Sequence, residues 1–337
     1  MSTHTTHMGR AVRLLAPLMH RVAAAAAVKR SRSAKRRADL RLAAPWFGGN
    51  NVTGVVVTRK TSGKERTRGE LAIQFLVRRK LAESRLRAEE LIPRVLRLDS
   101  LEREFLTDVL QCGATPVAHA FPRLRPVAPG SSIGHPRSLG GTLSLIVTRN
   151  GQPCYLSCSH VLAPGGSQWS SIGDEIEQPS DEFNADPGNV IGTLAAFTVL
   201  DPASSTNVTD AAVAQCNQVP FNRAFPGIGV PSDALTLAAS DFTDHSMVVS
   251  RAGVASPPAT GNIDGFGSIN ITYPDIGQVI VNDLVIYTAT AAGGDSGAAV
   301  FVNGTRTVAG LHVGLLDDNR SIFTPIQSVF DALGVSL

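Results

Sequence analysis

Residues 293–302 read Gly-Gly-Asp-Ser-Gly-Ala-Ala-Val-Phe-Val, a glycine-rich loop followed by an apolar run that predicts a buried strand. Its serine, Ser296, stands between small neighbours that would expose the hydroxyl and let another backbone come close. The amides of Gly294 and Ser296 could converge on a developing oxyanion. By itself the stretch is equally typical of an ordinary glycine-rich turn, so its meaning depends on the rest of the chain.

Two upstream motifs contain the residue types that a serine nucleophile requires. His160 ends the apolar segment 154–160, and Asp210 opens the small apolar segment 210–214. Alone, such a histidine is most often a core side chain and such an aspartate a turn or cap residue. Together they are more specific, because the histidine precedes the aspartate by 50 residues and the aspartate precedes Ser296 by 86. The order His, Asp, Ser separates one class of triad hydrolases from two others.

On these motifs, residues 133–337 resemble trypsin-like serine peptidases of the chymotrypsin fold. The matching segments are Ser-His-Val-Leu-Ala at 159–163, Asp-Ala-Ala-Val at 210–213 and Gly-Asp-Ser-Gly at 294–297. The stretch from Ser250 is similar, with substitutions, to the Gly-Arg-Thr-Thr-Gly segment of that family. The resemblance implies a mainly β fold with two antiparallel six-stranded β-barrels. Many short Val, Ile and Thr segments between turn residues agree with it.

The resemblance also implies a mechanism. Ser296 would be the nucleophile, His160 the general base and acid, and Asp210 the group that orients the imidazole. The amides of Gly294 and Ser296 would form the oxyanion hole. Proteins or peptides would be the substrates, and no metal or organic cofactor would be needed.

Asp295 has a separate role in that family, where it supports the oxyanion loop. In animal zymogens it pairs with a newly cut N-terminus. Because more than 130 residues precede the predicted barrels, we expect an internal cation to replace that amine, and Arg251 is a candidate. Cleavage immediately before Ile133 is the alternative, although the residue directly before it is not basic.

Three residues are predicted to shape the specificity pocket: Thr290, His312 and Gly314. Thr290 stands where a trypsin-type enzyme has aspartate, which argues against a preference for lysine or arginine. The segment 310–314 reads Gly-Leu-His-Val-Gly and resembles the Gly-Ile-His segment of glutamyl endopeptidases, whose histidine contacts an acidic P1 side chain. An acidic P1 residue and a small apolar one both remain open.

The charges divide the chain into two unlike parts. Lys and Arg number 31 and Asp and Glu 28, a net charge of +3. Residues 1–108 hold 23 basic and 10 acidic residues, whereas residues 109–337 hold 8 and 18. This asymmetry indicates units with different partners. A hydrophobic content of 43% excludes global disorder, and four cysteines are too few for a disulfide scaffold, so we expect free thiols.

We expect four segments. Residues 1–48 form a basic extension, partly helical or disordered, and residues 49–113 form a small α/β domain. Residues 114–132 form a Pro-rich linker, and residues 133–337 form the peptidase domain. The α/β domain is similar to one that precedes the peptidase in a group of bacterial and plant trypsin-like proteins. Some bacterial relatives resemble protease partners in antiviral defence modules, which implies a partner protein activated by cleavage.

Periodicity predicts the elements of the small domain. Alternating apolar residues predict strands over 52–60 and 70–78, and a mixed Glu and Arg pattern predicts a helix over 82–91. A closing strand is expected over 105–110 and a last helix over 325–333.

The basic N-terminus carries Arg10, Arg13 and Arg21 at helical spacing, opposite apolar residues. Residues 10–37 could contact an anionic membrane surface, contact a nucleic-acid backbone, serve as a transit segment, or form a solvated extension without a function of its own. The apolar stretch is a poor match to a secretory signal, and no run is long enough to span a membrane. We therefore expect a cytoplasmic protein.

The leading hypothesis is an active serine endopeptidase that works through an acyl-enzyme intermediate. The alternative is a catalytically silent binding or scaffold protein on a peptidase fold. Because the two parts of the chain have opposite net charge, the N-terminal region is expected to restrain the active site.

Overall fold

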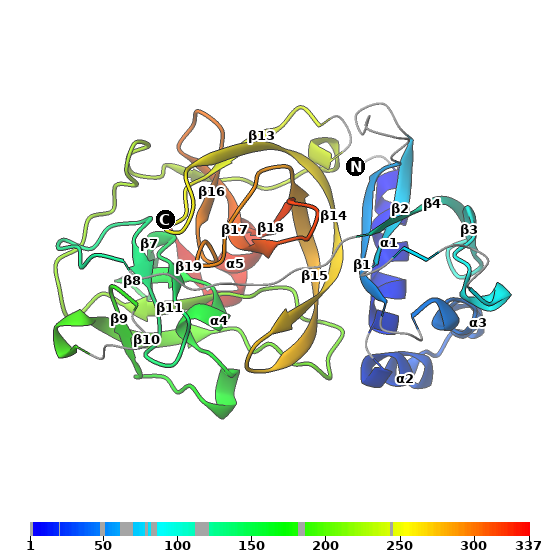
Figure 1. The fold of residues 1–337 in the computed structure, drawn as a ribbon, viewed down its shortest axis with the longest axis horizontal. Coiled ribbons are helices and arrows are strands. Elements are labelled where there is room, and N and C mark those ends of the chain that lie inside the picture. The colour runs from blue at the N-terminus through cyan, green and yellow to red at the C-terminus, as the bar shows by residue number, and fades with distance from the viewer. Residues whose placement is uncertain are drawn as a thin grey trace.

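The computed structural model describes residues 3–19, 21–47, 51–60, 70–77, 80–81, 86–111, 121–180, 186–242 and 245–337. The described part of the chain is mainly β, as predicted, and its strands form an 11-stranded sheet, a six-stranded sheet and a two-stranded sheet (Figure 1). Within the same ranges, no helix combines the length and hydrophobicity needed to cross a bilayer.

The six-stranded sheet has the order β19-β7-β8-β11-β10-β9. Its strands are β7 (Leu145–Arg149), β8 (Gln152–Ser157), β9 (Glu175–Glu177), β10 (Val190–Phe197), β11 (Ala212–Gln215) and β19 (Val335–Ser336). Strands β7 and β8 form a hairpin whose two-residue turn is Asn150-Gly151, with φ of 49° and 75°. Asn and Gly tolerate this left-handed conformation, which matches the twist of the strands.

The 11-stranded sheet has the order β13-β16-β17-β18-β15-β14-β1-β2-β4-β3, with β12 (Asp233–Ala234) paired to β17. Its C-terminal members are β13 (Val248–Arg251), β14 (Ala259–Tyr273), β15 (Gly277–Tyr287), β16 (Ala299–Val302), β17 (Thr307–Leu315) and β18 (Ser321–Pro325). Because β13 also pairs with β14, these six strands form a cycle of pairings. The two-stranded sheet joins β5 (Ser132–Ile133) to β6 (Gly141–Thr142).

The remaining strands belong to the N-terminal part of the chain: β1 (Val52–Arg59), β2 (Leu71–Val77), β3 (Val95–Leu98) and β4 (Arg103–Gln111). Strand β1 pairs antiparallel with β14 over Gly54↔Ile269 to Thr58↔Gly265. At Gly265 and Gly267 an added Cβ would lie 2.4 Å from a carbonyl oxygen of β1. One sheet therefore runs from the C-terminal body into the N-terminal part, a continuity that the predicted segment boundaries did not include.

The N-terminal helices cover this extension of the sheet. They are α1 (Thr3–Leu15), α2 (Arg21–Arg30) and α3 (Ala34–Ala43), with 3₁₀ turns at Ala16–Met19 and Ala44–Phe47. Figure 1 shows α1 alongside β1 and β2. Its apolar face, including Val12 and Leu15, shares a buried cluster with Phe75, whereas Arg10 and Arg13 are exposed. The amphipathic pattern thus has a packing cause, because its apolar side meets the sheet.

Some predicted elements fall partly on residues that the structure does not describe. In the expected helix over 82–91, residues 82–85 lie outside the described ranges, and the rest holds a 3₁₀ turn at Ala88–Glu90. Residues 112–113 of the expected small domain and residues 114–120 of the expected linker also lie outside them. The predicted strands correspond to β1, β2 and β4, and the last helix is α5 (Ile326–Leu333).

The close approach of β1 and β14 can be tested with Gly267→Val. The new side chain meets the Val55 carbonyl and the Val56 backbone, so β1 has to move away from β14. Overpacking of this kind typically costs about 1–3 kcal/mol. We expect a loss of that size in urea unfolding and faster proteolysis of the N-terminal part. Thr260→Val, on the exposed β13-paired end of the same strand, is the control; an equal loss there would contradict the account.

Candidate active site

The pairing of β8 with β11 brings His160 and Asp210 together. His160 lies in the one-turn helix α4 (Ser159–Leu162), just after β8, and Asp210 lies just before β11. The register Ala212↔Ser157 places the end of one strand beside the start of the other. Ser296 comes from the loop between β15 and β16, and it lines one small pocket together with His160.

The contact between His160 and Asp210 is short, and its aspartate side is buried from solvent. Asp210 is fully buried, and its Oδ2 lies 2.5 Å from His160 Nδ1. Its Oδ1 accepts a hydrogen bond from the His160 backbone amide at 3.0 Å. Burial alone would raise the pKa of Asp210, but the charge and hydrogen bonds of His160 and the Tyr273 hydroxyl hold that pKa below its usual value. The carboxylate stays ionised and binds the Nδ1 side of the ring, which leaves Nε2 as the acceptor in a neutral imidazole.

The Ser296 hydroxyl does not hydrogen-bond to the His160 imidazole. Its hydroxyl donates to the Val313 carbonyl at 3.0 Å, and the residue is 9% exposed. Ser296 and His160 nevertheless face one pocket of about 60 Å³, whose walls include the apolar side chains of Ile271, Val313 and Ile322. The structure therefore brings the three predicted residues into one site, with the serine hydroxyl on a carbonyl rather than on the imidazole.

The loop at 293–297 is held by hydrogen bonds to its carbonyl groups. Thr142 donates its amide to the Ser296 carbonyl at 2.7 Å and its hydroxyl to the Gly294 carbonyl at 2.9 Å. Gly294 and Gly297 have φ of 100° and 90°, a region that side chains disfavour. The Asp295 carbonyl accepts from the Ala298 amide at 2.9 Å, so the Ser296 N–H, across the same trans peptide, points away from the turn. No described residue accepts a hydrogen bond from the amides of Gly294 or Ser296.

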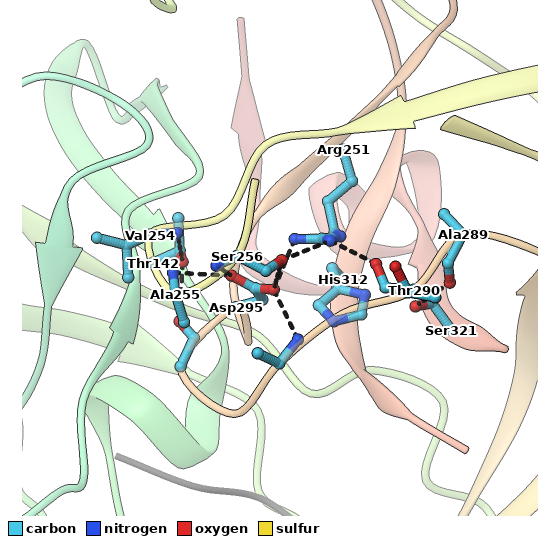
Figure 2. A network of polar contacts seen from close by, with 12 residues as sticks. Thr142, Arg251, Val254, Ala255, Ser256, Ala289, Thr290, Asp295, His312 and Ser321 are labelled. Atoms are coloured by element: carbon cyan, nitrogen blue, oxygen red, sulfur yellow. Dashed lines mark hydrogen bonds and ion pairs between the residues drawn. The ribbon is translucent and has the colours of Figure 1, made fainter. Parts of the chain in front are cut away.

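Asp295 pairs with the internal cation that the sequence predicted. Figure 2 shows Arg251 reaching the Asp295 carboxylate, with Arg251 Nη1 and Asp295 Oδ2 at 2.7 Å and both side chains inaccessible to solvent. The carboxylate also accepts from the amides of Ala255 (2.9 Å), Ser256 (3.1 Å) and Ala292 (2.9 Å). An ionised carboxylate in this position is compensated from several sides, which fixes the loop that carries Ser296.

The predicted specificity residues lie in different places. Gly314 lines the pocket beside Ser296, whereas Thr290 and His312 are not among its walls. The Thr290 carbonyl accepts from Arg251 Nη2 at 2.6 Å. His312 is buried, with Nδ1 3.0 Å from the Tyr287 hydroxyl. Burial, and then the charges of Arg251 and His160, lower the pKa of His312 well below its usual range.

Sequence reasoning missed Tyr273. This residue ends β14, and its hydroxyl donates to Asp210 Oδ2 at 3.0 Å. Its ring centroid lies 5.4 Å from that of His160. No motif marks this tyrosine, because only the register of the β14–β15 hairpin carries it to the aspartate.

Cys158 lies next to the same groups. Ligand atoms of Cys158, His160 and Asp210 lie within 4.8 Å of one another, a spacing that a metal ion could use. Burial raises the pKa of the Cys158 thiol well above its usual value, and the thiol points at the His312 carbonyl, 3.3 Å away. Since metals bind the thiolate, these residues fit a metal ion poorly. Cys154, Cys158 and Cys216 are free, and Cys112 lies outside the described residues.

Comparisons with known proteins point to solved structures only. No protein-family model matches the chain, and no curated protein matches it. Thermobifida fusca protease A is similar at 18% identity, over 63% of this chain and 97% of that one, with a TM-score of 0.44. A glutamic-acid-specific serine protease, described as using a histidine triad in substrate binding, is similar at 19% identity, over 63% and 100%, with a TM-score of 0.44. Nocardiopsis protease is similar at 15% identity, over 63% and 98%, with a TM-score of 0.42. The chain thus resembles bacterial chymotrypsin-fold serine proteases over about 63% of its length.

Removing the cation of the buried ion pair is expected to destabilise the protein strongly. Arg251→Met leaves the Asp295 charge buried beside a neutral side chain, a change that typically costs about 3–5 kcal/mol. Urea unfolding measures the loss. Arg13→Met breaks the exposed ion pair with Asp283 and should cost less than about 1 kcal/mol. Similar losses in the two variants would contradict the role assigned to Arg251.

The low pKa of His312 makes stability depend on pH. Below about pH 6.5 a histidine in the unfolded chain binds a proton, whereas the buried His312 of the folded protein stays neutral. This group therefore lowers the free energy of unfolding as the pH falls from about 6.5, the usual pKa of a histidine, toward 5. Urea unfolding at pH 5, 6 and 7 should show a shallower slope in His312→Gln. His135, whose pKa burial also lowers, remains in both proteins and gives the residual slope. Equal slopes in the two proteins would overturn the assignment.

Proposed function

We propose that this protein is a serine endopeptidase that hydrolyses peptide bonds in protein or peptide substrates. The observation that carries the proposal is the buried Asp210 bound to His160 Nδ1, with Ser296 in the same pocket. A lone histidine or serine near a pocket has many explanations. An ionised, buried carboxylate that fixes one imidazole nitrogen beside a serine in a constrained loop matches a nucleophile, its base and the group that orients the base.

In the proposed mechanism, Ser296 Oγ attacks the scissile carbonyl while His160 Nε2 takes the hydroxyl proton. The tetrahedral intermediate collapses when His160 returns that proton to the leaving amine, which forms the acyl-enzyme. Water then attacks the ester with His160 again as base, and Ser296 is released with its proton restored. Asp210 stays ionised throughout and stabilises the imidazolium that forms in each step.

The amides of Gly294 and Ser296, from which no described residue accepts a hydrogen bond, are proposed to bind the oxyanion. They are available because Thr142 holds the loop through its carbonyls, and Asp295 anchored on Arg251 keeps the turn closed. A donor of this kind contributes about 3–4 kcal/mol of transition-state stabilisation in a comparable enzyme. The support that Asp295 gives to the oxyanion loop is thus part of the proposal.

The pocket favours a small apolar P1 residue. Its volume is about 60 Å³, and beside His160 and Ser296 its walls are formed largely by apolar side chains such as Ile271, Val313 and Ile322. The acidic alternative needs His312 to contact the P1 side chain, whereas this histidine is buried, is not among the walls of the pocket and has its Nδ1 against the Tyr287 hydroxyl. Thr290 likewise contributes a carbonyl to Arg251 rather than a wall to the pocket.

One observation favours the alternative of a silent peptidase-fold binding protein. The Ser296 hydroxyl donates to the Val313 carbonyl, and attack requires it to rotate toward His160. Staggered χ1 rotamers of serine differ little in energy, and hydrogen bonds to the base often form only in the substrate complex. We therefore assign the observed rotamer to the free enzyme. Restraint by the N-terminal region is a further element of the proposal, supported by the β1–β14 pairing and the Arg13–Asp283 ion pair.

Labelling with a fluorophosphonate tests the proposed function, because this reagent reacts with a serine only when a base and an oxyanion site activate it. We expect mass spectrometry to locate the label on Ser296 in the wild type. Asp210→Asn should label about 10³–10⁴-fold more slowly, because the imidazole then takes the wrong tautomer.

Ser296→Ala is the control that excludes labelling elsewhere. Labelling of the wild type and of Ser296→Ala at equal rates, or of neither, would favour the silent binding protein.

A further inference from the structure

We propose that Tyr273 is a positioning residue of the triad, whose hydroxyl holds the Asp210 carboxylate in the orientation that binds His160. The inference deepens the proposed function and rests on it. It assigns a role to a residue on β14, the strand that also pairs with the N-terminal part of the chain.

The contact is direct and involves the reactive side of the carboxylate. The Tyr273 hydroxyl donates to Asp210 Oδ2 at 3.0 Å, the same oxygen that lies 2.5 Å from His160 Nδ1. Both donors from His160 itself depend on where the histidine lies. Among the described residues, Tyr273 is the donor to Asp210 that is independent of His160, so it can fix the carboxylate before the imidazole docks.

Burial makes this donor hard to replace. Asp210 is inaccessible and Tyr273 is 4% exposed, so water has little access to the carboxylate. A buried anion that loses a donor pays the desolvation of that hydrogen bond in full. Burial and then the nearby Asp210 charge raise the pKa of Tyr273 well above its usual value, so the hydroxyl keeps its proton and remains a donor at working pH.

The fold fixes where the hydroxyl lies. Tyr273 pairs with Gly277 at the end of the β14–β15 hairpin, and β1 pairs with β14 from residue 265 to residue 269. Beyond the strand end, Asp275 and Ile276 lie against the segment that follows His160, where they line a small recess with Gly165. The tyrosine is held between an extended sheet on one side and the histidine loop on the other.

No other described side chain takes over this role. Cys158 faces the His312 carbonyl, and His312 Nδ1 faces the Tyr287 hydroxyl. Asp275 is the further acid near His160, and burial raises its pKa. The charged and titratable groups around the pair are therefore Cys158, Tyr273, Asp275 and His312, and of these only Tyr273 donates to Asp210.

Tyr273→Phe isolates the hydroxyl, because the ring keeps its contact with His160. A hydrogen bond to a charged group is strong enough that its loss lowers kcat on a peptide ester about tenfold or more, with KM changed less than about twofold. A second readout needs no catalysis: the downfield proton NMR signal of His160 Nδ1–H, recorded in a Ser296→Ala background. We expect its exchange with solvent to be about tenfold faster when residue 273 is phenylalanine.

Tyr155→Phe is the matched control, since Tyr155 is also buried but lies on β8 of the six-stranded sheet, where its ring packs against Phe221. It should leave kcat and the Nδ1 signal unchanged. A Tyr273→Phe protein with wild-type kcat and an unchanged signal overturns the proposal. So does a Tyr155→Phe protein with equal losses, because loss of any buried hydroxyl would then suffice.

Two further arms keep the result decisive. If near-ultraviolet circular dichroism shows that Tyr273→Phe does not fold, 3-fluorotyrosine at position 273 retains the ring and the hydroxyl. Its more acidic hydroxyl must then move the His160 Nδ1–H resonance, and an unmoved resonance overturns the proposal. If the wild type neither cleaves nor labels, the peptidase proposal fails, while the Nδ1 signal in the Ser296→Ala background still decides whether Tyr273 positions Asp210.

Discussion

The buried negative charge of Asp210 is the constraint on which the rest of the site depends. A carboxylate without contact to water has to be surrounded by donors, and here the donors come from two parts of the fold. The β8–β11 pairing brings the backbone and ring of His160, and the end of β14 brings Tyr273. The fold around the site therefore keeps this charge buried and hydrogen-bonded at the same time.

A second buried charge, that of Asp295, fixes the other half of the site. Its partner Arg251 lies on β13, so the ion pair ties the Ser296 loop to the cycle of strands in the C-terminal body. Breaking such a pair is costly, although keeping it adds little stability over an apolar packing. Its contribution here is geometric, because it helps to fix the Ser296 loop, where no described residue accepts a hydrogen bond from the amides of Gly294 or Ser296. In the proposed mechanism the two anions have different roles: Asp210 would orient the base and Asp295 would shape the oxyanion loop.

The sequence predicted the parts of this arrangement that local motifs encode. The order of His160, Asp210 and Ser296 indicated the triad, and the segment around Arg251 indicated the internal cation. The motifs could not predict Tyr273, because its position depends on the register of a hairpin. Nor could they predict the β1–β14 pairing, which joins segments about 200 residues apart through edge hydrogen bonds that any extended segment can make. His312 was placed at the pocket by resemblance, but burial and the contact with Tyr287 give its side chain a different surrounding.

In the proposed mechanism Ser296 leaves the Val313 carbonyl and attacks the carbon of a carbonyl group whose oxygen is bound by the amides of Gly294 and Ser296. A crystal structure of the protein after reaction with a peptidyl phosphonate measures this most directly. We expect a covalent bond from Ser296 Oγ to phosphorus, a phosphoryl oxygen within about 2.7–3.1 Å of both amides, and His160 Nε2 within hydrogen-bond reach of the adduct. An unmodified Ser296 still bound to the Val313 carbonyl, or an adduct whose oxygen points away from those amides, would contradict it.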